Sequence, residues 1–84
     1  MNITDLKRDD KAVIISLRSI EKSFMDRLMD LGIYEKASIT LLNILAYDNL
    51  YLIEVDAIEI CLRKEDALNI EVRKWSIYSQ VIRM

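Results

Sequence analysis

One short helix with a defined end is the feature that most constrains how this chain can fold. Between Ser23 and Ile33, apolar residues recur at helical spacing, with two methionines beside them: Phe24, Leu28, Leu31, Met25 and Met29. Ser23 is placed to cap the helix, and Asp26 three residues later completes a capping box. Gly32 supplies the left-handed residue that commonly ends a helix. The remaining pattern favours strands, so we expect a mainly β domain that contains this helix.

Short alternating segments make up most of the rest of the chain. They predict five strands, at Ala12 to Leu17, Ala37 to Ala46, Leu50 to Val55, Ile58 to Leu62 and Asn69 to Arg73. Strands of this length and spacing are typical of a small closed barrel or a sandwich. Arg63 to Leu68 is long enough for a single helical turn. The predicted fold is therefore mainly β, with one or two short helices and one of them between the first two strands.

The alternation also predicts how side chains are distributed between the faces of the strands. Val13, Ile15 and Leu17 should share one face of the first strand, and the side chains expected to point inward from the last two strands are Ile58, Ile60, Leu62, Ile70 and Val72. The second strand is apolar on both faces, which is consistent with cover on both sides. Asp48-Asn49 is a credible two-residue hairpin turn, because both residue types tolerate positive φ, and Asp56-Ala57 is a weaker turn signal.

Length and composition exclude several classes of protein. The chain has 84 residues and a net charge of −2 without a basic stripe, so we expect one domain that does not bind nucleic acid. The N-terminus lacks the apolar run of a signal peptide, and no segment approaches the roughly 20 apolar residues of a membrane span. Cys61 is the single cysteine, which fits a reducing compartment. We expect a cytoplasmic protein without direct membrane insertion.

Groups that carry catalysis or bind metals are scarce. Histidine, the commonest general base and transition-metal ligand, is absent. Cys61 is best explained as a semi-buried small residue, and Met25 and Met29 as core or interface side chains. The carboxylates are better explained by solvated faces and turns than by a cation site, namely Asp26, Asp30, Glu54, Asp56 and Glu59. No glycine-rich loop offers a nucleotide site. We predict no enzyme, no metal site and no cofactor.

Binding to another protein is the better hypothesis. The hydrophobic fraction is 52%, which for so small a domain favours a partner or a homo-oligomer. One candidate surface surrounds the first hairpin and comprises Leu42, Ile44, Tyr47, Leu50, Tyr51 and Leu52. A second lies on the helix and comprises Met25, Met29 and Tyr34. The alternative for the hairpin surface is cover by the helix or by the C-terminal residues.

The order of these features resembles the FeoA family of small ferrous iron transport proteins. The family's helix typically ends in a Leu-Gly-Leu or Leu-Gly-Ile step, here Leu31-Gly32-Ile33. Leu6 falls at the family's opening leucine, and Cys61 to Ala67 resembles its Ala-Leu-Arg followed by charged residues and alanine. Asn69 to Val72 resembles its closing strand. The family's usual proline and glycine turn residues are missing, and Ala57 stands where glycine is usual.

The resemblance implies a fold and a partner. The fold is an SH3-like five-stranded barrel, which we expect over residues 1–74. Residues 75–84 lie beyond this pattern, and we expect them to form an extension that packs on the domain or forms an interface. The implied function is that of a non-catalytic adaptor for the cytosolic part of FeoB, the ferrous iron transporter. The alternative is a module related to the SH3-like C-terminal domain of iron-dependent transcriptional repressors, acting through protein–protein interaction.

Overall fold

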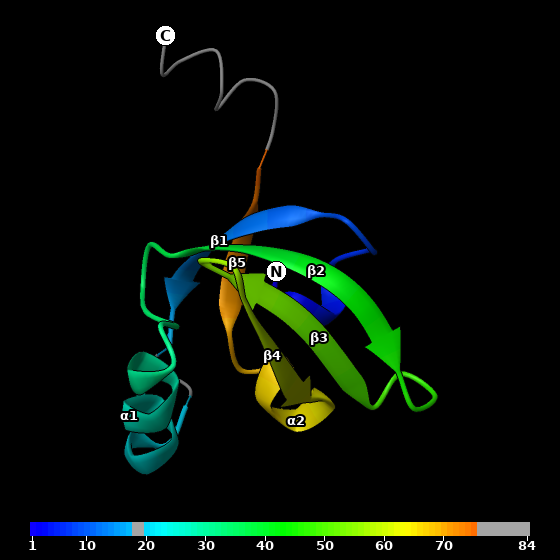
Figure 1. Cartoon of the computed structure of the whole chain (residues 1–84). Coiled ribbons are helices and arrows are strands. Elements are labelled where there is room, and N and C mark those ends of the chain that lie inside the picture. Colours follow the sequence, from blue (N-terminus) through cyan, green and yellow to red (C-terminus); the bar gives the residue numbers. More distant parts are fainter. Residues whose placement is uncertain (18–19, 76–84) are drawn as a thin grey trace, which may run out of the picture.

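The computed structural model describes residues 1–17 and 20–75 and is mainly β (Figure 1). The elements are η1 (Ile3–Asp5), β1 (Lys11–Ser16), α1 (Lys22–Asp30), β2 (Ser38–Leu45), β3 (Leu50–Val55), β4 (Ile58–Arg63), α2 (Lys64–Ala67) and β5 (Glu71–Lys74). The five predicted strands and the helix between the first two are confirmed. The expected second helix is the four-residue α2.

One antiparallel sheet holds all five strands, in the order β4-β3-β2-β1-β5. The sheet curves around the core but does not close, because β4 and β5 are its two edges in the described part of the chain. The N-terminus covers the β5 edge. Asn2 forms a β-bridge with Glu71, and the Val72 N–H donates to the Met1 carbonyl at 2.8 Å. The β4 edge has no such cover among the described residues.

In the described part of the chain, the core consists of aliphatic side chains and the ring of Tyr51. The buried side chains include Ile3 from η1, Leu28 from α1, Ala67 from α2 and inward residues of every strand. Among the described residues, no polar or charged residue is buried. The sheet therefore needs an unbroken apolar inner face, and the strand register supplies it.

A bulge in β1 changes which side chains of that strand face inward. In β1, Ala12 and Ile14 are buried, whereas Val13 is half-buried and Ile15 is 45% exposed. The expected shared face of Val13, Ile15 and Leu17 is therefore wrong, because of the three only Leu17 is buried. The pairing with β5 slips between Ile14 and Ser16, which makes Ile15 the extra residue. A one-residue insertion reverses the later alternation, so Leu17 becomes buried.

Inward assignments in the last two strands are confirmed with one exception. Ile60, Leu62, Ile70 and Val72 are buried as predicted. Ile58 is 51% exposed although it shares their side of the sheet. It lies at the end of an edge strand, next to the turn, where no neighbouring element among residues 1–17 and 20–75 covers it.

Helix α1 begins and ends by different means. The predicted capping box is wrong, because the N-cap is Glu21 and Ser23 lies inside the helix, where its Oγ contacts Glu21 Oε1 at 3.3 Å. The predicted stop is confirmed, with Gly32 at φ +95°. The Gly32 N–H donates to the Met29 carbonyl and the Ile33 N–H to the Leu28 carbonyl. This is the Schellman arrangement, and its usual apolar pair is the buried Leu28 and Ile33.

Both hairpin turns place ordinary residues in left-handed conformations. The β2–β3 loop has four residues, 46–49, instead of the predicted two, and Ala46, Tyr47 and Asp48 all have positive φ. The β3–β4 turn has the two residues Asp56 and Ala57, at φ 51° and 68°. Positive φ at both central positions is the geometry of a type I′ turn, in which the second position favours glycine.

The expected C-terminal extension is described only at its first residue. The Trp75 N–H donates to the Lys11 carbonyl at 2.8 Å and so continues the β1–β5 pairing. The expectation that 75–84 packs on the domain or forms an interface otherwise falls outside the described residues.

Replacing Ala57 by glycine should stabilise the fold by about 1 kcal/mol, because an L-residue in the left-handed region costs roughly 1–2 kcal/mol and glycine does not pay it. Gly32→Ala should have the opposite sign and a similar size. A Cβ at position 32 would meet nothing within 4 Å, so only the backbone is strained. Urea unfolding of both variants measures the two shifts. Equal signs would contradict this account of the turns.

Tyr51 should make the protein lose stability in alkali. Burial raises the pKa of its phenol above the ordinary value of 10.0, and the charges of Asp48 and Asp5 add to the shift. The folded protein therefore keeps a proton that the unfolded chain releases. The resulting stability is present below pH 10 and is lost as the pH rises through the folded pKa.

Tyr51→Phe should flatten the fall in the free energy of unfolding above pH 10. Urea unfolding at a series of pH values measures that fall. Tyr47→Phe is the matched control, since the Tyr47 side chain is fully exposed. If the free energy of unfolding of Tyr51→Phe falls above pH 10 as steeply as that of the wild type, Tyr51 is not the group responsible.

Candidate partner-binding site

An apolar groove lies between α1 and the end of β1. It has a volume of about 290 Å³ and is lined by Leu17, Met25, Met29, Tyr34 and Glu35. The structure thus brings the three residues of the predicted helix surface into one concave site. Sequence reasoning missed Leu17 and Glu35 as members, because the β1 bulge and the loop after α1 bring them there.

The end of α1 sets the shape of this groove. After Gly32, the chain reverses through a β-turn in which the Ala37 N–H donates to the Tyr34 carbonyl at 3.0 Å and Lys36 has φ 77°. The Lys36 N–H then donates to the Ile14 carbonyl at 2.7 Å. These bonds fix the loop against β1. As a result, Tyr34 stands opposite Met25 and Met29, which lie one turn apart on the helix.

The groove combines exposed apolar area with one anchored carboxylate. Met29 is 53% exposed and Tyr34 is 46% exposed, whereas Met25 packs partly on the core. Glu35 Oε2 accepts a hydrogen bond from the Leu17 N–H at 3.2 Å, which holds the side chain at the rim. The site can take an apolar side chain, and the flexible methionines can adapt to its shape.

The predicted hairpin surface is divided between the two faces of the sheet. Ile44 and Tyr51 pair and point inward, and Tyr51 is 5% exposed. Leu50 and Leu52 point outward and are half-buried. Leu42 is half-buried at the bulge in β2, where the pairing slips between Leu41 and Asn43. These residues therefore do not form one surface.

The exposed part of the hairpin lies far from α1 (Figure 1). Tyr47 projects fully from the loop, and Leu45, which the sequence analysis did not select, is 40% exposed. Beside them on the outer face, Arg8 donates to Asn43 Oδ1 at 3.0 Å. A partner could reach the groove or the hairpin tip as separate sites.

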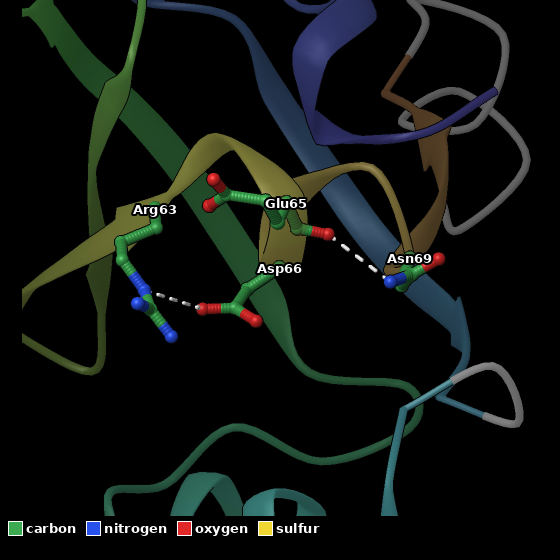
Figure 2. A network of polar contacts seen from close by, with 4 residues as sticks. All are labelled: Arg63, Glu65, Asp66 and Asn69. Atoms are coloured by element: carbon green, nitrogen blue, oxygen red, sulfur yellow. Dashed lines mark hydrogen bonds and ion pairs between the residues drawn. The ribbon is translucent and has the colours of Figure 1, made fainter.

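Other concave regions are more polar. One of them has a volume of about 480 Å³ and lies on the outer face near Lys11, Thr40, Glu54, Asp56 and Trp75. Another, of about 310 Å³, lies beside α2. There, Arg63 Nε is 3.6 Å from Asp66 Oδ2, and Asn69 Nδ2 donates to the Glu65 carbonyl at 3.1 Å (Figure 2). These contacts fasten the short α2 to the chain around it.

The charged groups form local contacts. The Lys7 N–H hydrogen bond lowers the pKa of Asp10, and Lys74, at 3.4 Å, lowers it further. No group of three or more histidine, cysteine or acidic side chains that could hold a metal occurs within residues 1–17 and 20–75. Cys61 is exposed, which corrects the expectation that it is semi-buried. Over the same residues, no helix is long and apolar enough to cross a membrane.

Solved structures of FeoA and FeoA-like proteins share this fold. The FeoA protein of Chlorobium tepidum aligns with a TM-score of 0.85 at 25% identity, over 90% of this chain and 71% of that chain. A FeoA-like protein of Clostridium acetobutylicum aligns with a TM-score of 0.77 at 18% identity, over 90% and 87% of the two chains. These alignments support the predicted SH3-like architecture.

Metal-dependent regulators share the same architecture. The repressor ScaR in its Cd²⁺-bound form aligns with a TM-score of 0.77 at 23% identity, over 88% of this chain but 35% of that chain. No curated protein matches the sequence. The FeoA domain model matches residues 1–74, which is most of the chain. The protein therefore belongs to the FeoA domain family.

Proposed function

We propose that this protein is a non-catalytic, cytoplasmic adaptor that binds the cytosolic part of a FeoB ferrous iron transporter. Membership of the FeoA family supports a role in ferrous iron transport. The observation that carries the binding role is the groove of Leu17, Met25, Met29, Tyr34 and Glu35. Its open apolar side chains suit an anchor residue of another protein.

The surroundings of the groove enlarge the area available for contact. Leu31 is 46% exposed at the end of α1, close in sequence to Met29 and Tyr34. Methionine and tyrosine are favoured at interfaces, because methionine adapts its shape and tyrosine adds area with a polar tip. Binding there would shift the transporter toward the conformation that this protein binds more tightly, by an amount set by the difference between its affinities for the two conformations.

The likeness to ScaR favours a second candidate function. In that protein, a domain of this shape is one part of a longer chain. The same domain could serve as a protein-interaction module in metal-dependent transcription. Salt-dependent binding of this chain to duplex DNA, or binding to a DNA-binding regulator, would favour this function over the adaptor role.

Replacing Met29 and Tyr34 together by alanine should weaken binding to FeoB about tenfold or more, because both side chains lose contact area at the centre of the proposed site. Calorimetry should use the cytosolic GTPase region and the full-length transporter of the same organism, each with and without guanine nucleotide. The variant should keep its unfolding midpoint, since both side chains are about half exposed.

Leu68→Ala is the matched control, because Leu68 is 48% exposed on the segment after α2. It should bind like the wild type. Wild-type affinity of the double variant for FeoB would show that the interface does not include the groove. Absence of binding by the wild type under every condition would refute the adaptor role.

A further inference from the structure

We propose that the free edge of β4 pairs with β4 of a second copy of this chain, in an antiparallel register centred on Cys61. The observations that support this are the unequal cover of the two sheet edges, the backbone direction of β4 and its charge pattern. They are independent of the groove beside α1 and of the adaptor role.

The two edges of the sheet differ in whether other backbone groups of the chain cover them. The β5 edge is capped by the Asn2–Glu71 bridge and by the bond from the Val72 N–H to the Met1 carbonyl. In the described part of the chain, β4 pairs only with β3. An edge strand without cover presents backbone donors and acceptors to another chain.

The β3–β4 turn determines which residues present those groups. Because Val55 and Ile58 flank a two-residue turn, they form a hydrogen-bonded pair, and the bonding residues of β4 then alternate as Ile58, Ile60 and Leu62. The Lys64 N–H continues this series by donating to the Asn49 carbonyl at 2.9 Å. The N–H groups of the intervening residues, Glu59, Cys61 and Arg63, therefore point away from β3.

The side chains of these outward-bonding residues complement a second copy. Antiparallel pairing centred on Cys61 places Glu59 of one copy opposite Arg63 of the other, twice, and Cys61 opposite its equivalent. All three residues are exposed, with 75% of the Arg63 side chain accessible. Charges on an edge usually prevent pairing between copies, but this arrangement attracts its own copy.

The apolar side chains also become continuous in this register. On the outer face, Leu52 pairs with Cys61 within one chain. In the dimer, Leu52 and Cys61 of one copy and Cys61 and Leu52 of the other would form one continuous row of side chains across the interface. On the inner face, Ile60 would lie opposite Leu62 of the second copy. The half-exposed Ile58 would lie beside the start of the second copy's α2, which would reduce its exposure to water.

Glu59→Arg should separate the effect on the dimer from the effect on the fold. Within one chain, Glu59 lies directly opposite Glu54, so arginine replaces repulsion by attraction and should raise the unfolding midpoint. Between copies, arginine would face Arg63 twice. The dimer dissociation constant should therefore rise about tenfold or more, measured by sedimentation velocity over a wide concentration range.

The double variant Glu59→Arg/Arg63→Glu should bring the dissociation constant back toward the wild-type value, because it exchanges both charges across the interface, although it also removes the contact between Arg63 and Asp66. Hydrogen exchange should show concentration-dependent protection of the Glu59 and Cys61 amides. A wild-type protein that stays monomeric, or a dimer insensitive to Glu59→Arg, would overturn the proposal. So would equal protection at every concentration, which would mean that the same chain covers this edge.

Oxidation by diamide provides a geometric test. The wild-type dimer should form a Cys61–Cys61 disulfide rapidly, since opposed residues of a hydrogen-bonded pair lie about 5.5 Å apart, within disulfide range. A variant that carries Cys61→Ser and Asp56→Cys moves the thiol to the exposed turn and should cross-link more slowly. Equal rates would contradict the register.

A different outcome would assign this edge to the transporter. If the wild-type protein is monomeric and the Glu59→Arg variant no longer binds FeoB, the β4 edge contacts FeoB and the dimer proposal fails.

Discussion

An unbroken apolar inner face on one small curved sheet is the constraint on which this structure depends. Its continuity rests on two bulges, at Ile15 in β1 and beside Leu42 in β2. Each adds one residue to its strand, which reverses the side-chain alternation and sharpens the bend. Without the first bulge, Leu17 would point to solvent, and the groove beside α1 would lose one wall. Curvature, core and candidate site therefore share a backbone cause.

Much of the architecture could be predicted because it is encoded by local patterns. The alternation of apolar residues located all five strands, and Leu31-Gly32-Ile33 marked the end of α1 through a requirement for positive φ that glycine meets at low cost. The start of α1 was misjudged because a serine near a helix start is only a weak signal. Here Glu21 occupies the N-cap without a side-chain bond.

The site was harder to predict because it depends on long-range geometry. Met25, Met29 and Tyr34 could be selected from helical spacing and from their nearness to Gly32. Leu17 and Glu35 could not, since a bulge and a hydrogen-bonded loop bring them there. The predicted hairpin surface combined Tyr51, which is buried, with Leu50 and Leu52, which face outward. The bulge in β2 changes which side chains of that strand face the core, and the sequence does not show where this change occurs. Bulges leave little trace in a single sequence.

The attachment of α1 has a consequence for how the groove behaves in time. Within the helix, Leu28 is the fully buried side chain, whereas Phe24 and Met25 are only partly buried against the core. Elements with few buried apolar contacts open at lower free energy than the central strands. We expect α1 to undock as a unit before the sheet unfolds. The measured affinity of any ligand of the groove would then include the fraction of molecules in which α1 is docked.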